Sequence, residues 1–300
     1  MRLRPGLLAP LLVVMACESD TGPSGPPALH DRIVFVSTRE GARELYHMGL
    51  DGSDVTPIPW VHWPFEPEVS PDGEWIAYHG SFSDIWVQRV DGSEWRNLTQ
   101  GAAECAFPAW RPDGGLLVFG CTENATADLW TVKPDGTELA PLGVGPAVFP
   151  SWSPDGNRIA FGANLDGNWE VYVANLSTMM VENLTESPDV NEQVPRWSPD
   201  GQWISYSTDA DLPAGPVTLE LLNPETGARR RPPAFAGGAF VRWSPDSRAV
   251  TYARALPTYA AGDIVVQDIE TGDLTVVLPP DGFEDFSPTY APPSPAWPRR

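Results

Sequence analysis

The sequence has few of the residues on which most catalytic sites depend. Its 300 residues include four histidines and three cysteines. It contains no Gly-x-Ser-x-Gly motif, which presents the nucleophilic serine of α/β-hydrolases, and no phosphate-binding loop. We therefore expect no cofactor, and we favour a binding protein over an enzyme.

Positive charge is also scarce. Nineteen Lys and Arg residues face 40 Asp and Glu residues, so the formal net charge is −21. Such a chain is repelled by the phosphate backbone, and we expect no binding to nucleic acid. The charge would suit a basic partner, although a solvated acidic surface is the simpler explanation.

A basic start and a short apolar run predict an export signal over residues 1–16. The apolar part, Leu7 to Ala16, is too short for a permanent membrane span. Residues 14–17 resemble a bacterial lipobox, which would make Cys17 a lipidated N-terminus; an ordinary leader that contains Cys17 is the alternative. Residues 17–30 are rich in Gly and Pro and predict a tether. We expect a lipid-anchored protein of the bacterial envelope, on the periplasmic face of the outer membrane or at the cell surface.

A motif of Trp-Ser-Pro-Asp-Gly followed by a short apolar stretch recurs along the chain, most clearly from Trp152 to Phe161. Successive copies lie 41, 42, 45 and 46 residues apart, counted on their prolines, which are Pro71, Pro112, Pro154, Pro199 and Pro245. A period of this size indicates one supersecondary unit that is repeated.

Each unit predicts four short antiparallel strands, A to D. The Pro-Asp-Gly turn joins A to B, and in several units an Asp-Gly turn joins C to D. The first unit lacks strand A, whereas Pro288 to Pro292 matches strand A alone. We therefore predict an all-β, six-bladed β-propeller as a single domain over residues 31–292, followed by a tail over 293–300. The C-terminal strand would complete the first blade and so remove the open edges.

The repeat resembles the TolB-type, WD40-like propeller repeat, in which Trp-Ser-Pro-Asp-Gly is followed by Ile-Ala-Phe, an apolar strand and a closing Leu-Thr. Here the pattern is clearest in Trp152 to Phe161 and in Ile85 to Val87 with Leu98 and Thr99. The resemblance implies a six-bladed propeller and says little about function. We expect a lipoprotein member that lacks the N-terminal α/β domain of TolB.

The repeats differ most in the loops that lead into strand A. Because strand A is innermost, these D–A loops and the B–C loops surround one mouth of the central channel, which we call the funnel face; the Pro-Asp-Gly turns lie on the opposite turn face. We predict that an acidic, aromatic-edged binding surface forms here from Trp63, Glu66, Glu104, Asn191, Glu192, Glu284 and Asp285. Deeper in the channel we place Glu68, Arg196 and Arg242, each directly before the last residue of strand A. A generic set of acidic loops is the alternative.

Two other groups of residues have structural explanations. The aspartates of the Pro-Asp-Gly turns, such as Asp155, can each accept hydrogen bonds within their own turn, so we assign them no binding role. His62, His79 and Asp84 could approach one another on the funnel face, but their spacing is not diagnostic of a metal site, and we predict none.

Cys105 and Cys121 are predicted to form a disulfide between strands A and B of the third blade. If Pro112 to Gly114 form the loop, Arg111 faces Gly115, and the same register places the two cysteines opposite each other. Opposed Cα atoms lie about 4.5–5.5 Å apart, within disulfide range. An oxidising envelope favours the bond, and two free buried thiols are the alternative.

These observations together predict a non-enzymatic, monomeric envelope lipoprotein. Its propeller would bind a protein or peptide through the D–A and B–C loops. The alternative is a hydrolase or lyase that acts on carbohydrate or peptide at a small site in the funnel.

Overall fold

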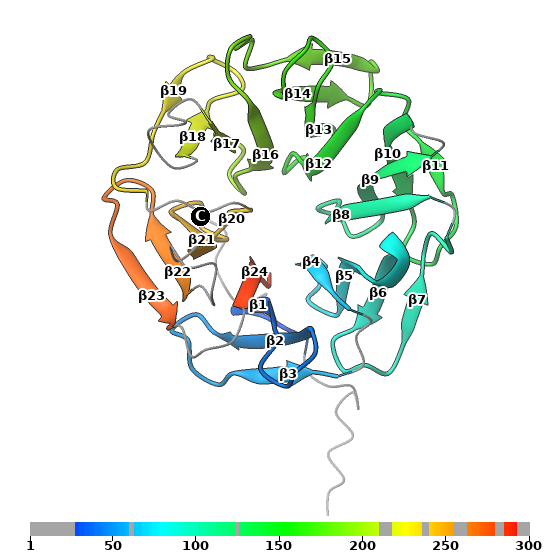
Figure 1. Cartoon of the computed structure of the whole chain (residues 1–300), viewed down its shortest axis with the longest axis vertical. Helices are drawn as coiled ribbons and strands as arrows, with labels where there is room; N and C mark the ends of the chain where they lie inside the picture. Colours follow the sequence, from blue (N-terminus) through cyan, green and yellow to red (C-terminus); the bar gives the residue numbers. More distant parts are fainter. Residues whose placement is uncertain are drawn as a thin grey trace, which may run out of the picture.

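The computed structural model describes residues 28–59, 63–101, 103–123, 126–209, 218–235, 240–254, 263–279 and 285–292. They form six four-stranded antiparallel sheets arranged as a ring (Figure 1). The predicted six-bladed propeller is therefore confirmed. The described residues include no helix that is both long and apolar enough to cross a membrane. The predicted signal peptide, Cys17 and residues 293–300 lie outside the described part of the chain.

The blades share one order of strands from the channel to the rim. Strand A is β24 (Asp285–Tyr290), β4 (Phe65–Val69), β8 (Glu104–Trp110), β12 (Ala147–Trp152), β16 (Glu192–Trp197) and β20 (Arg242–Trp243) in blades 1 to 6. Strand B is β1 (Arg32–Ser37), β5 (Trp75–His79), β9 (Leu117–Glu123), β13 (Arg158–Ala163), β17 (Ile204–Thr208) and β21 (Ala249–Arg254). Strand C is β2 (Glu44–Gly49), β6 (Ile85–Arg89), β10 (Thr126–Val132), β14 (Glu170–Asn175), β18 (Thr218–Leu222) and β22 (Asp263–Asp268). Strand D is β3 (Thr56–Ile58), β7 (Trp95–Asn97), β11 (Ala140–Pro141), β15 (Met180–Asn183), β19 (Arg229–Arg230) and β23 (Leu274–Leu278), and a short 3-10 helix, η1 (Ser81–Ser83), lies between β5 and β6.

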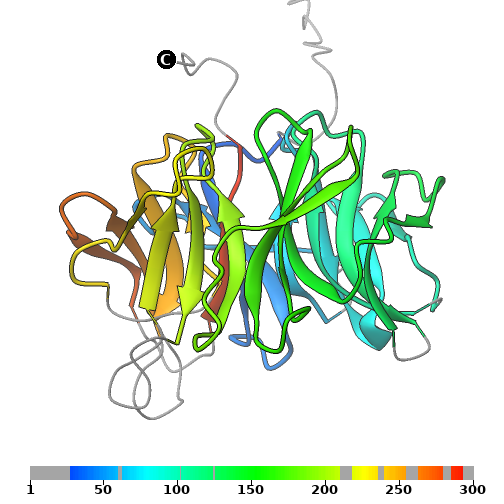
Figure 2. The same cartoon turned by 90° about the horizontal axis from the view of Figure 1, so that it is seen from above.

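The C-terminal strand closes the ring as predicted. β24 pairs with β1, so that Tyr290 lies opposite Ile33, and the two strands lie side by side in both views (Figures 1 and 2). The described N-terminal segment is fixed beside it, because the amide of Asp31 donates to the carbonyl of Pro292 at 3.1 Å. The amide of Leu29 donates to Gly73 in a Pro-Asp-Gly turn, so the chain enters the propeller on the turn face.

Each Ser-Pro-Asp-Gly turn is a local hydrogen-bonded unit. In blade 4, Ser153 Oγ donates to Asp155 Oδ1 at 2.5 Å, and the same carboxylate oxygen accepts the amide of Asn157 at 3.1 Å. Gly156 has a φ of 70°, which a glycine adopts without steric cost. These bonds lower the pKa of Asp155, with the Ser153 hydroxyl as the main cause. The turn aspartate therefore has the structural role predicted for it.

Tryptophans at the ends of the innermost strands join neighbouring blades. Trp152 is 6% exposed, and its indole Nε1 donates to the carbonyl of Ala109 in the preceding blade at 3.2 Å. Trp110 and Trp243 make the corresponding bonds to Glu68 and Arg196, both at 3.1 Å. These three tryptophans thus fill the space between two sheets and also satisfy their own polar groups there, whereas the indole nitrogen of Trp197 in blade 5 is buried without a hydrogen-bond partner.

The two cysteines of blade 3 are bonded to each other in the predicted register, but the register at the turn differs from the predicted one. Cys105 lies directly opposite Cys121, with Cα atoms 4.1 Å apart. At the turn, however, the amide of Arg111 donates to Leu116 rather than facing Gly115, so the register is one residue away from the expected one. A β-bulge between Ala106 and Ala109 shifts the register back and opposes the cysteines.

Candidate functional site

In each blade the non-glycine residue three positions before the end of strand A has a left-handed backbone. These residues have φ values of 46° to 61° and form what we call the bulge ring: Glu66, Phe107, Phe149, Val194, Phe240 and Ser287. In blades 1 to 5 the strand register shifts at this point. A left-handed L-residue costs roughly 1–2 kcal/mol, so the surrounding structure must enforce this conformation.

Three phenylalanines of the bulge ring meet across the channel. The ring centroids of Phe107 and Phe149 are 4.3 Å apart, and that of Phe240 lies 6.0 and 5.9 Å from them. These residues precede or belong to β8, β12 and β20, which lie on different sides of the ring (Figure 1). The channel is therefore narrowed by aromatic side chains.

The aromatic contacts continue into blades 1 and 2. The ring of His79 is stacked on that of Phe65, with centroids 5.0 Å apart, and its centroid lies 5.6 Å from that of Phe107. The ring centroid of Phe286 lies 6.2 Å from that of Phe65. We call the whole group the aromatic floor; it consists of Phe65, His79, Phe107, Phe149, Phe240 and Phe286, all of which are half-buried. Burial lowers the pKa of His79, so this side chain is neutral at pH 7. The floor thus offers partly exposed, uncharged aromatic surface.

Next to the aromatic floor, charged side chains link blades across the channel. Arg242 Nη2 donates to Glu66 Oε2 at 3.0 Å, and Ser287 Oγ donates to the other oxygen of Glu66 at 2.6 Å. Arg242, Glu66 and Ser287 thus join blades 6, 2 and 1. Both charged side chains are buried. Glu68 accepts the amide of Trp110 at 3.1 Å, and burial raises its pKa while Arg242 and Arg196 oppose the shift.

Arg196 is built into the wall of the channel. It is 7% exposed, and its Nη1 donates to the carbonyls of Pro195 and Phe149 at 2.9 and 3.2 Å. Burial, aided by the nearby positive charge of Arg242, lowers the pKa of Arg196 to about 9. The two arginines predicted for the channel therefore act together with Glu66 and the main chain as part of its framework.

The residues predicted for the mouth of the funnel separate into two groups. Glu192 and Asp285 are buried and, like Glu66, paired with arginine: Arg229 approaches Glu192 at 3.5 Å, and Arg39 approaches Asp285 at 3.1 Å. The mouth is consequently less acidic than the sequence indicates.

Three other predicted mouth residues are exposed. Trp63 has 58% of its surface exposed, Glu104 begins β8, and the side chain of Asn191 donates to Asp209 at 2.8 Å. Glu284 lies outside the described residues.

The sequence did not single out two further features of the funnel face. Phe82, in η1, is 91% exposed and has a left-handed backbone. The guanidinium carbon of Arg43 lies 4.2 Å from the ring centre of Phe65 and 5.3 Å from that of Phe286, a cation–π arrangement at the edge of the floor. The repeated Phe-Pro of Phe107-Pro108 and Phe149-Pro150 was the available signal for the floor.

No three His, Cys, Asp or Glu side chains of the described ranges gather closely enough to hold a metal ion. Of the three residues considered for such a site, His62 lies outside those ranges. Asp84 instead fixes the end of strand D, because its carboxylate accepts hydrogen bonds from Thr99 at 2.6 Å, Gly101 at 2.7 Å and Asn97 at 2.8 Å.

Residues 143–294 match the family model of the TolB beta propeller domain, which is half of the chain. The chain belongs to the TolB-type propeller family. Over 110 residues it is 31% identical to a protein TolB homolog of Chlorobaculum tepidum, a match that covers 35% of this chain and 25% of that protein. Over 81 residues it is 33% identical to the Tol-Pal system protein TolB of Anaeromyxobacter dehalogenans. That match covers 26% of this chain and 19% of the relative.

The matches thus span a quarter or less of the length of these TolB relatives. The propeller also resembles the crystal structure of TolB from Acinetobacter baumannii, with a TM-score of 0.75 and 18% sequence identity. That superposition covers 89% of this chain and 68% of the other. At this identity the likeness concerns the fold.

Proposed function

We propose that this TolB-type propeller is a protein- or peptide-binding platform of the bacterial envelope, and that its partner docks on the funnel face above the aromatic floor. The observation that carries the proposal is the meeting of half-buried phenylalanines from blades 3, 4 and 6. Aromatic side chains held rigidly in a concave site provide most of the binding energy in many interfaces.

The rim of the funnel face supplies further groups suited to a protein partner. Trp63 and Phe82 are large apolar side chains that are 58% and 91% exposed. Arg43 presents a guanidinium at the edge of the floor, where it could contact a carbonyl or carboxylate of the partner. Tryptophan and arginine are the residue types most often found at such energetic centres.

Two observations support a place in the envelope, and a third concerns the orientation of the propeller there. The relatives named above include a Tol-Pal system protein. The Cys105–Cys121 disulfide suits an oxidising compartment. The chain enters on the turn face at Leu29. If Cys17 carries the lipid, the tether would therefore leave the funnel face pointing away from the membrane.

Site-specific cross-linking tests this proposal. A photo-reactive phenylalanine analogue is placed at position 63 or 82 on the funnel face of the full-length chain, or at position 135 in a turn on the opposite face. We expect the same cross-linked protein from positions 63 and 82 and none from 135. Cross-links from position 135 alone would refute the proposed face.

A matched pair of substitutions measures how much the rim contributes to binding of the partner. Trp63→Ala should reduce capture of the cross-linked partner about tenfold, as expected for a tryptophan at an interface centre. Trp95→Ala, which removes a tryptophan that is 52% exposed on the outer strand of blade 2, should leave capture unchanged.

A further inference from the structure

The outermost strands of the propeller differ in how their free main-chain edges are protected. Proline, charged side chains and covering loops are the usual ways in which proteins prevent a further strand from pairing at an edge. Four outer strands carry such a residue: Pro57 in β3, Arg96 in β7, Pro141 in β11, and Arg229 and Arg230 in β19. Blade 1 covers β23 at Val277, because a Cβ added at Gly52 would lie 1.8 Å from the carbonyl oxygen of that residue.

Among the described outer strands, β15 of blade 4 has no proline, no basic residue and no such close approach from a neighbouring blade; its one charged residue is Glu182. It instead continues a run of three exposed apolar side chains, with Met179, Met180 and Val181 exposed by 58%, 70% and 39%. Single exposed apolar residues are ordinary on a surface, but an adjacent run along a free edge is not.

The main chain of β15 is oriented for pairing on its outer side. The amide of Leu184 donates inward to Val171 of β14 at 2.8 Å. In an antiparallel pair, inward and outward groups alternate along the strand. The N–H and C=O groups of Val181 and Asn183 therefore point outward, away from β14.

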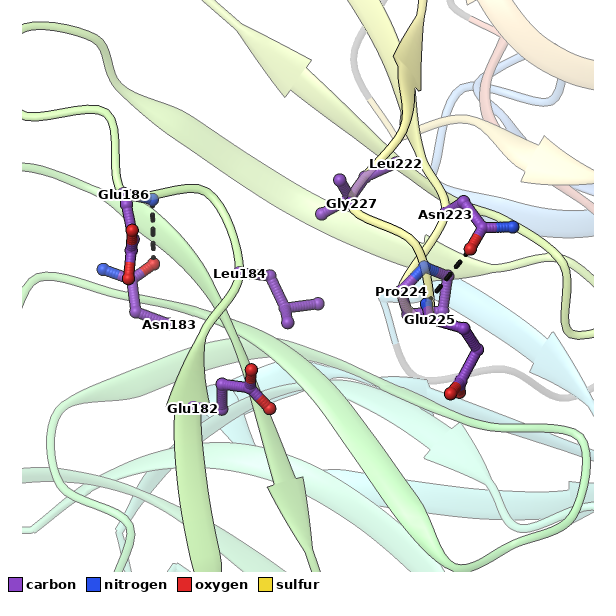
Figure 3. Close-up of a pocket in the computed structure, with 9 residues that line it drawn as sticks. All are labelled: Glu182, Asn183, Leu184, Glu186, Leu222, Asn223, Pro224, Glu225 and Gly227. Carbon is purple, nitrogen blue, oxygen red and sulfur yellow. Dashed lines mark hydrogen bonds between the residues drawn. The ribbon is translucent and has the colours of Figure 1, made fainter.

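An acidic groove of about 300 Å³ lies beside this edge, between the outer parts of blades 4 and 5. Figure 3 shows Glu182 and Leu184 on one side of the groove and Pro224 and Glu225 on the other. Glu225 is paired with Arg158 at 2.8 Å. Glu182 and Glu186, both exposed, add further negative charge to the lining.

We propose that β15 accepts a fifth strand from a partner protein, an extended segment that carries lysine or arginine. Its main chain would pair with Val181 and Asn183, its apolar side chains would cover Met180 and Val181, and a basic side chain would enter the groove beside Glu182. This surface lies on the outer wall of the ring, so the inference does not depend on the funnel face.

The charge of the surface favours a basic partner over a second copy of this chain. Two copies paired edge to edge through β15 would each bring Glu182 and Glu186 to the shared edge. Like charges opposed across strands are destabilising, and a net charge of −21 on each chain adds to the repulsion.

A peptide probe tests the inference with the full-length protein. The probe is a fluorescent, N-acetylated and C-amidated peptide of alternating valine and lysine, and binding is followed by anisotropy. Val181→Pro removes an outward N–H and leaves the inward bonds to β14 in place, so the blade should keep its fold. We expect the probe to bind about tenfold more weakly to this variant.

Charge reversal identifies the role of the groove. The double variant Glu182→Lys with Glu186→Lys should lose affinity for the valine–lysine probe and gain affinity for a valine–glutamate probe. Glu40→Lys, an exposed change on blade 1, should alter either affinity less than about twofold. Hydrogen exchange should show new protection at Val181 and Asn183 when the probe is bound.

Three results would overturn the inference. The first is equal probe affinity for Val181→Pro and the unchanged protein. The second is protection that appears only at the funnel face. The third is a dimer in sedimentation that Val181→Pro dissociates, since that would make a second copy the occupant of the edge.

Discussion

The two ends of the innermost strands are built in opposite ways. At the turn end of β12, Ser153, Asp155 and Gly156 form hydrogen bonds within one short segment. At the funnel end of the same strand, Phe149 has a left-handed backbone and contacts Phe107 and Phe240 of other blades. The repeats agree at the turn end, where the Ser-Pro-Asp-Gly turn is local, and they differ at the funnel end, where side chains of several blades meet.

The largest effect is expected for the tryptophan wedge near the turn end. Trp152→Ala empties a buried space between blades and removes the hydrogen bond to Ala109, so it should lower the free energy of unfolding by about 4 kcal/mol. Urea unfolding followed by far-UV circular dichroism measures this value. Trp95→Ala, which removes a half-exposed ring that contacts Trp86, should lower it by only about 1 kcal/mol, and equal losses for both variants would contradict the wedge role.

The ion pair at the funnel end should show strong coupling between blades. Arg242→Ala leaves Glu66 buried without its partner and should lower the free energy of unfolding by about 3 kcal/mol. The double variant Arg242→Met, Glu66→Gln should lose clearly less free energy of unfolding than its two single variants, Arg242→Met and Glu66→Gln, lose together. A double-mutant cycle gives the coupling energy, and strict additivity would show that the pair does not join the blades.

The disulfide joins the two inner strands of blade 3 near their funnel ends. Cys105 and Cys121 are 16 residues apart in the sequence, and loss of such a cross-link should lower the free energy of unfolding by about 2 to 3 kcal/mol. Thermal unfolding with and without a reducing agent tests this. The double variant Cys105→Ser, Cys121→Ser should show no response to the reducing agent, and an unchanged midpoint for the parent protein would be inconsistent with the bond.

The smallest effect is expected at a single turn carboxylate. The pKa of Asp155 is lowered in the folded protein, chiefly by the hydroxyl of Ser153. Its stabilising effect is therefore fully present above the pKa of the unfolded chain, near 3.8, and is lost as the pH falls through the lower folded pKa. Because the group is largely solvated, Asp155→Asn should change the free energy of unfolding by less than about 1 kcal/mol at pH 7. The difference between variant and parent should shrink below pH 4, which unfolding at several pH values can measure.

The sequence pointed to the funnel face and its loops but not to the aromatic floor, and the cysteine pair shows why. The two cysteines were placed opposite each other with a register that is one residue off at the turn. The bulge at Phe107, which no local motif announces, restores the pairing. The same bulge brings Phe107 into the channel, whereas the sequence pattern pointed only to the D–A loops and to the residue before the last residue of strand A. Glu192 and Asp285 were placed at the mouth, but their burial and their arginine partners depend on residues distant in the chain.

The sequence by itself determined the repeat, the number of blades and the strand that closes the ring. It could do so because each Ser-Pro-Asp-Gly turn is specified by a few neighbouring residues whose hydrogen bonds are made within the turn. Only the tertiary structure decided which side chains meet at the centre and which outer edge lacks protection. Those properties arise when six separately specified blades are forced into one closed ring, because residues from distant repeats then share a single channel and Gly52 of the first blade covers the last.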